Sequence, residues 1–175
     1  KVHHPIKLLS LEKTKSIEPL RKLLGYNDGL VSLKIDGLTL FATYSGGKLV
    51  GLATRGDGEV GEDVFHNAAA VLNLPLHIPY KGLLYVTGEG AVGFSDFEKI
   101  NSALPPEDQY SNPRNLAAGS IRQLDSGIAS KRRVSFNVFR IEAPDKPFSR
   151  KSEALEWGKK LGFNIVEYQK VHRDK

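Results

Sequence analysis

The chain has 175 residues, of which 40% are hydrophobic and 26% charged, a composition typical of one folded domain. No apolar run approaches the roughly 20 residues of a membrane helix, and the first residues carry no apolar segment of the signal-peptide type, so a cytoplasmic protein without membrane contact is expected. The absence of cysteine excludes disulfides and thiolate zinc sites, and the net charge of +5 is spread too evenly to identify a polyanionic partner.

The first part of the chain predicts a short helix followed by strands. Ser16 can cap a helix over residues 16–24, which Gly25 would end. Branched and aromatic side chains then predict an antiparallel meander of three strands, over residues 30–34, 38–44 and 48–53. Residues 54–63 are too rich in glycine for a regular element and predict a loop, after which small apolar residues allow a helix over 62–72.

The rest of the chain mixes strands and helices without strict alternation. The predicted elements are a strand over 83–92, helices over 94–104 and 113–124, a strand over 133–141 and a helix over 151–161. Asn112 and Pro113 fit the cap and first position of the helix over 113–124. The predicted fold class is therefore α+β, with antiparallel sheets flanked by helices.

Lys34 ends a predicted strand and is followed by Asp36 and Gly37, where the chain must turn. A lysine amine attacks an electrophile only when it is neutral, and burial beside a strand end would lower its pKa toward that state. Asp36 can orient the amine or bind a nucleotide sugar, and Gly37 allows a close approach of the backbone to a ligand. The alternative is a solvated lysine before an ordinary Asp-Gly turn, which the four-residue pattern alone favours.

Three further segments carry residues suited to a nucleotide. Ala53-Thr54-Arg55-Gly56-Asp57-Gly58, continued by Gly61-Glu62-Asp63-Val64, would present Arg55 to a phosphate or ribose, unless it is a solvated hairpin loop. Glu89 lies between two glycines in an apolar strand, where a buried acid needs a partner such as a ribose hydroxyl. Arg114 and Arg122 lie about two helical turns apart, on nearly one helix face, where they can meet phosphates or form structural salt bridges.

These four segments, in this order and spacing, resemble the adenylation domain of bacterial NAD-dependent DNA ligases, from about His4 to Val171. Lys-x-Asp-Gly alone is shared with ATP-dependent ligases and capping enzymes. The run Asn112–Asp125 and the segment Ala53–Val64, here called the arginine-glycine loop, make the combination specific. The resemblance implies a nucleotidyltransferase fold, ATP-grasp-like, of which residues 1–175 form an incomplete core. It also implies that Lys34 attacks the AMP phosphate of NAD to give lysyl-AMP, releases nicotinamide mononucleotide (NMN), and passes AMP to the 5′-phosphate of a DNA nick.

The resemblance further assigns roles to individual residues. Lys34 and Asp36 belong to the catalytic motif. The residues implied to contact the nucleotide are Ser10, Leu11, Ser32, Leu33, Arg55 and Glu89. Arg114 and Arg122 match basic residues that contact DNA or phosphate, and such contacts would be sensitive to salt and indifferent to base sequence. NAD and Mg²⁺ are the implied cofactors, without an assigned metal ligand, and a monomer acting on nicked double-stranded DNA is expected.

The chain departs from the family pattern at several positions. Ser32 stands where the family usually has Glu, Thr87 replaces an arginine that commonly precedes the Gly-Glu pair, and Gly90 follows where a larger residue is common. The chain is also expected to lack the helical NMN-binding segment, two later lysine motifs, and the oligonucleotide-binding, zinc, helix-hairpin-helix and BRCT modules. These departures favour an alternative, a diverged non-catalytic nucleotide- or DNA-binding paralogue or fragment. An ATP-dependent ligase or capping-type enzyme is argued against by the arginine-glycine loop and the Asn112–Asp125 run.

Overall fold

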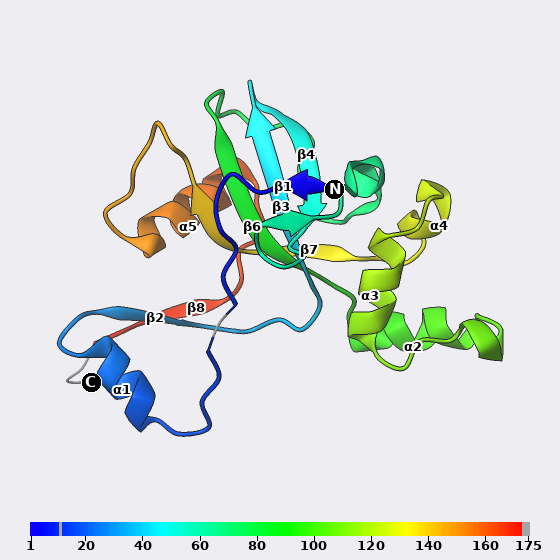
Figure 1. Cartoon of the computed structure of the whole chain (residues 1–175), viewed down its shortest axis with the longest axis horizontal. Coiled ribbons are helices and arrows are strands. Elements are labelled where there is room, and N and C mark those ends of the chain that lie inside the picture. The colour runs from blue at the N-terminus through cyan, green and yellow to red at the C-terminus, as the bar shows by residue number, and fades with distance from the viewer. Residues whose placement is uncertain (11, 173–175) are drawn as a thin grey trace.

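A computed structural model describes residues 1–10 and 12–172 of the chain (Figure 1). Its centre is an antiparallel sheet of four strands in the order β4-β3-β6-β7. These strands are β3 (Leu38–Ser45), β4 (Lys48–Thr54), β6 (Leu84–Ala91) and β7 (Ser135–Glu142). The hairpin between β3 and β4 closes through Gly46 and Gly47, whose φ angles of 62° and 80° suit a tight two-residue turn. The antiparallel sheet expected from the sequence is confirmed.

Two short ribbons accompany the central sheet. They pair β1 (Val2–His3) with β5 (Val60–Gly61), and β2 (Gly29–Ser32) with β8 (Tyr168–Val171). The predicted meander is therefore wrong in its first strand, because β2 pairs with a strand near the other end of the described chain rather than with β3. Figure 1 shows the β2–β8 ribbon and the neighbouring helix α1 standing apart from the central sheet.

The helices flank the sheet or its connections. The α-helices are α1 (Glu18–Leu24), α2 (Phe94–Ser102), α3 (Pro113–Ile121), α4 (Ser126–Ser130) and α5 (Lys151–Leu161). Two 3₁₀ helices are η1 (Phe65–Ala70) and η2 (Pro106–Asp108). The Asn112 side chain caps α3 and Gly162 ends α5 with φ 101°, as predicted, whereas α1 has Ile17 and not Ser16 at its N-cap. No helix in the described part of the chain is long and apolar enough to cross a membrane.

The helix predicted over 62–72 is only the 3₁₀ helix η1. Its buried Asn67 explains the difference, because the Asn67 side chain donates hydrogen bonds to the carbonyl oxygens of Ile121 (2.9 Å) and Gln123 (2.6 Å). These bonds tie the segment to the end of α3. The short 3₁₀ helix satisfies these bonds, so the longer helix expected from the sequence does not form.

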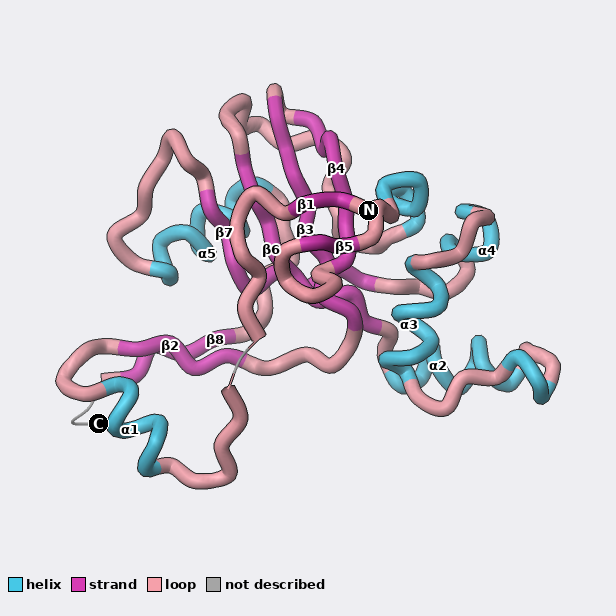
Figure 2. The backbone as a smooth tube through the Cα atoms, viewed as in Figure 1, coloured by secondary structure: helices cyan, strands magenta, loops and turns pink. Residues whose placement is uncertain are grey.

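The two faces of the central sheet have different partners. Leu40, Ala42 and Tyr44 alternate along β3 on the face that forms the hydrophobic core with η1, α3 and α5, and none of them exposes any of its surface. Thr39 and Phe41 point to the opposite face. There the N-terminal segment crosses the sheet, with the His4 ring edge-on to Phe41 at 5.2 Å between ring centroids (Figure 2). This second face carries the polar residues of the candidate site.

Candidate functional site

Lys34 lies in the link between β2 and β3, two residues beyond the last residue of β2. The burial expected beside a strand end is not found, because the Lys34 side chain is exposed and Leu33 before it is 58% exposed. The link reaches the central sheet at the buried Gly37. A Cβ atom at this position would lie 2.1 Å from the carbonyl oxygen of Gly90, so only glycine lets the link lie against β6.

A polar row crosses β3, β6 and β7 of the central sheet next to this link and is continued by Arg55 after β4. The Arg55 amide, just beyond β4, donates to the Thr39 carbonyl oxygen at 3.1 Å. Thr39 on β3 is directly opposite Glu89 on β6, and Glu89 is directly opposite Asn137 on β7. Opposed residues of an antiparallel pair point to the same face, so Glu89 shares a face with Thr39 and Asn137, two residues that the sequence did not indicate. The Arg55 backbone lies beside Thr39 at one end of this row. Thr39 and Asn137 stand out only once the strand register is known.

Glu89 is the half-buried carboxylate of this row. The Thr39 hydroxyl donates to its Oε2 at 2.9 Å, and the Asn137 side-chain amide donates to its backbone oxygen at 3.1 Å. Burial raises the pKa of Glu89, while the Thr39 hydrogen bond, the positive charge of Lys34, the Gly37 amide and the charge of Arg114 oppose that rise. Lys34 and Arg114 therefore lie close enough to Glu89 to stabilise its ionised form.

Arg114 joins the site from the first turn of α3. Its Nη1 lies 3.4 Å from Oδ1 of Asp36, and both side chains are largely exposed. Lys34, Asp36, Arg114 and Asn137 line one hollow of about 380 Å³, together with residues 91–94 after β6. These four polar residues, from three separate parts of the sequence, thus surround one space large enough for part of a nucleotide.

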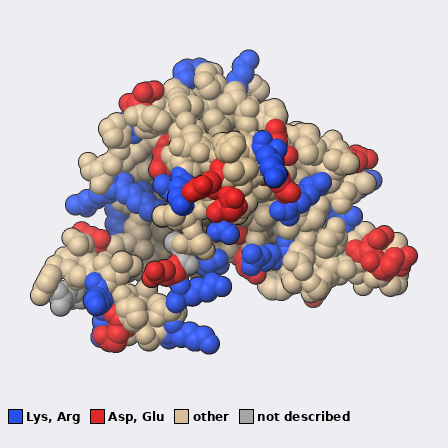
Figure 3. Space-filling model, viewed as in Figure 1, with Lys and Arg blue, Asp and Glu red and all other residues tan. Residues whose placement is uncertain are grey.

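Arg122 lies at the other end of α3 and does not reach this hollow. It pairs with Glu62 of the arginine-glycine loop and also donates to the Ala118 carbonyl oxygen. Arg114 and Arg122 thus each form an ion pair with an acidic residue, and the two pairs lie at opposite ends of α3. Figure 3 shows basic and acidic side chains interleaved over the visible face, so no continuous basic stripe marks a DNA surface there.

Three of the remaining predicted nucleotide contacts, Ser10, Ser32 and Leu33, lie at the surface. Ser10 and Ser32 are exposed, and the Leu33 amide donates to the Glu167 carbonyl oxygen at 3.0 Å, which extends the β2–β8 ribbon. Leu11 lies outside the described residues. The roles of these four residues therefore stay predictions. Among the residues that the structure describes, no three His, Asp or Glu side chains gather in a group that could hold a metal ion.

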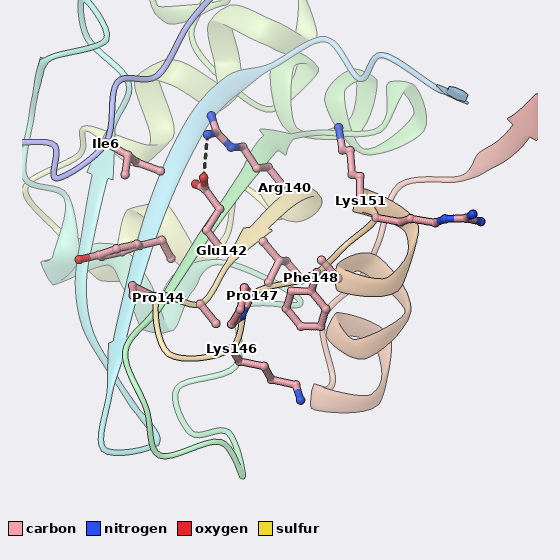
Figure 4. A pocket seen from close by; sticks show the side chains of 13 residues that line it. Ile6, Arg140, Glu142, Pro144, Lys146, Pro147, Phe148 and Lys151 are labelled. Atoms are coloured by element: carbon pink, nitrogen blue, oxygen red, sulfur yellow. Dashed lines mark hydrogen bonds and ion pairs between the residues drawn. The ribbon is translucent and has the colours of Figure 1, made fainter. Parts of the chain in front are cut away.

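A second, larger hollow of about 510 Å³ lies between β7, the loop after it and α5 (Figure 4). Its lining includes Arg140, Lys146 and Lys151, but Arg140 is paired with Glu142 at 2.8 Å and Lys146 lies over the Phe148 ring. Figure 4 shows these cations pointing in different directions rather than toward one point. None of the predicted site residues lines this hollow, so its size does not make it the candidate site.

The chain is similar to known DNA ligases over nearly all of its length. The family described as NAD-dependent DNA ligase adenylation domain matches residues 1–175. The DNA ligase of Lachnoclostridium phytofermentans is 47% identical over 174 residues, and that of Ruminiclostridium cellulolyticum is 42% identical over 174 residues. These matches cover 98% of this chain but 27% and 26% of the relatives, so the chain spans about a quarter of their length.

A solved structure named "Pmar-Lig_Pre." superposes with a TM-score of 0.55 at 11% identity, over 90% of this chain and 34% of that one, which shows a similar fold. The resemblance inferred from the four motifs is confirmed by the family match and by relatives well above 30% identity. The chain belongs to the family of NAD-dependent DNA ligase adenylation domains.

Proposed function

We propose that this chain forms the core of an adenylation domain in which Lys34 takes the AMP group of NAD. The neutral amine of Lys34 attacks the phosphorus of the AMP half, an N–P bond forms, and the P–O bond to NMN breaks with NMN as the leaving group. The observation that carries the proposal is that Lys34, Asp36 and Arg114 line one hollow in a member of this family. The charges of Lys34 and Arg114 also stabilise the ionised form of the neighbouring Glu89.

The side chains of the site fit a dinucleotide. Glu89 is an acceptor at the end of an apolar strand, suited to a ribose hydroxyl, because an ionised carboxylate accepts strong hydrogen bonds. Arg114, and Arg55 at the end of the polar row, supply positive charge for the two phosphates. Asp36 acts on the site through Arg114, which it holds beside the Lys34 link. Ser10, Leu11, Ser32 and Leu33 are proposed to border the adenine.

The steps that follow formation of lysyl-AMP involve a DNA substrate. AMP would pass from Lys34 to the 5′-phosphate of nicked double-stranded DNA, with Arg114 and Arg122 meeting backbone phosphates. A 3′-hydroxyl would then attack the adenylated phosphate, which seals the nick and releases AMP. Mg²⁺ fits the phosphate oxygens of the dinucleotide, where it would offset charge during transfer. We further propose that the mixed fold is the nucleotidyltransferase fold and that the chain acts as a monomer.

Adenylation tests the proposal directly. The chain would be incubated with Mg²⁺ and NAD labelled in its AMP half, denatured, and assayed for covalent label. Weak label is expected on the wild type and on Lys48→Ala, a matched change of an exposed lysine at the start of β4, and none on Lys34→Ala. Label from ATP and not from NAD would refute the choice of donor. Absence of label from both, with AMP still bound, would instead favour a non-catalytic nucleotide-binding module.

A further inference from the structure

We propose that Thr39 is a positioning residue for nucleotide binding, whose hydroxyl holds the Glu89 carboxylate in place for the ribose. This inference rests on the proposed function, because it deepens the role of Glu89 in that site. Thr39 lies two residues after the Lys-x-Asp-Gly motif and none of the sequence motifs includes it. It acts through Glu89 and is not itself assigned a contact with the nucleotide.

The geometry places Thr39 where it can fix the carboxylate. Thr39 and Glu89 are directly opposed in the β3–β6 pair, and the Thr39 Oγ1 donates to Glu89 Oε2 at 2.9 Å. Threonine is branched at Cβ, so its χ1 angle is restricted and the direction of its hydroxyl follows from the strand backbone. The carboxylate has about four lone-pair sites on its two oxygens, so it can still accept a ribose hydroxyl while Thr39 holds Oε2.

The neighbouring strand holds the other part of Glu89. Asn137 on β7 donates its side-chain amide to the Glu89 backbone oxygen at 3.1 Å, and its own Oδ1 accepts from Asn164 at 3.0 Å. The main chain of Glu89 is thus fixed from β7, whereas its carboxylate is fixed from β3. Asn137 binds the backbone oxygen of Glu89 and not its carboxylate, so this second anchor sets position rather than ionisation.

Thr39 also matters to the charge of Glu89. Burial favours the neutral acid, and four groups oppose it: the Thr39 hydroxyl, Lys34 from the β2–β3 link, the Gly37 amide and Arg114 from α3. Among these four, the hydrogen bond from Thr39 has the largest effect, larger than either positive charge. Arg55, from the end of β4, is the other cation of the row. A neutral hydroxyl on the adjacent strand is therefore the main support for the ionised form.

Thr39→Val tests this role with little change of shape, because valine is isosteric, branched at Cβ and equally suited to a strand. Thr39→Ser retains the hydroxyl. Thr43→Val is the matched control, because Thr43 is also half-buried and lies on the same strand and the same face of the sheet. The three variants separate the loss of a hydroxyl at this position from the general effect of a Thr→Val change in β3.

Two measurements decide the outcome. The Glu89 side-chain carbon would be titrated by NMR in the ligand-free chain, and AMP and NAD affinities would be measured by calorimetry at pH 7. Thr39→Val should move the Glu89 midpoint upward by about one pH unit and weaken nucleotide binding about 10-fold, since hydrogen bonds to charged groups are worth about that much. Thr39→Ser and Thr43→Val should stay close to the wild type in both.

An unchanged Glu89 midpoint in Thr39→Val would overturn the inference, whatever happens to binding. A shifted midpoint with unchanged nucleotide affinity would also overturn it, because Thr39 would then support a charge that the nucleotide does not use. If the wild type binds neither AMP nor NAD, the proposed function fails. The titration, which needs no nucleotide, would still decide separately whether Thr39 holds Glu89 ionised.

Discussion

Glu89→Gln removes the charge of a half-buried carboxylate and keeps its size. Burial raises the pKa of Glu89 in the folded chain, so the folded state binds the proton more tightly than the unfolded state does. The stability that Glu89 contributes is therefore fully present below its unfolded pKa and is lost as the pH rises through its folded pKa. Glu89→Gln should consequently raise the free energy of unfolding at pH 7 and have little effect near pH 3.5, where the wild type is itself protonated.

Nucleotide binding should change in the opposite direction. If Glu89 accepts a ribose hydroxyl, the hydrogen bond is made to a charged group, which is worth about 1.5–3 kcal/mol. Glutamine keeps a neutral acceptor, so the loss is the difference between a charged and a neutral hydrogen bond, about 1–1.5 kcal/mol. Since about 1.4 kcal/mol corresponds to a tenfold change, the Kd for AMP or NAD should rise about 5- to 10-fold. Glu89 would then lower the free energy of unfolding at neutral pH but strengthen nucleotide binding. Such opposite effects are expected of a carboxylate that serves function rather than stability.

Thermal unfolding between pH 3.5 and 8, together with calorimetric titration with AMP, measures both effects. The gap in Tm between Glu89→Gln and wild type should widen as the pH rises. Glu98→Gln, a change of an exposed acid on α2, is the control and should alter neither Tm nor nucleotide affinity. A lower Tm for Glu89→Gln at pH 7, or a gap independent of pH, would refute the reasoning about burial; unchanged affinity would refute the role in binding.

Two other changes probe the surroundings of Lys34. Gly37→Ala would place a Cβ atom 2.1 Å from the Gly90 carbonyl oxygen, so the link that carries Lys34 must move away from β6. Covalent labelling by NAD should then fall at least about 10-fold, because small misplacements of reacting groups are costly. Labelling at the wild-type rate would contradict this close approach. Arg114→Gln breaks an exposed ion pair with Asp36 and should lower the free energy of unfolding by less than about 1 kcal/mol. Its binding to nicked DNA should lose about one unit of salt slope, measured from affinities over a range of salt concentrations, and an unchanged slope would exclude a phosphate contact.

The features predicted correctly from the sequence are those with local causes. Each of these features depends only on residues that are close together in the sequence. They are the Gly46-Gly47 turn between β3 and β4, the Asn112 cap of α3 and the Gly162 end of α5. Each has a specific backbone or hydrogen-bond requirement that few residues satisfy. Such signals do not depend on the rest of the fold, so they can be interpreted without it.

The features missed by the sequence depend on contacts between distant segments. β2 pairs with β8, which lies about 140 residues further along the chain. The 3₁₀ form of η1 depends on the hydrogen bond from Asn67 to the end of α3. Thr39 and Asn137 could not be recognised, because their relation to Glu89 exists only in the strand register. The exposure of Lys34 was missed for the same reason, since a strand end predicts burial only if other strands cover it.

The pairing of β2 with β8 determines when the link that carries Lys34 becomes ordered. Gly29 pairs with Val171, near the end of the described residues, whereas β3 pairs with β4 across a two-residue turn. Joining segments so far apart in the chain loses more conformational entropy before contacts form, so pairings of long sequence separation form late in folding. The sheet that carries Glu89 should therefore assemble first. During synthesis, the proposed nucleophile would reach its final position only after nearly all of these residues have left the ribosome.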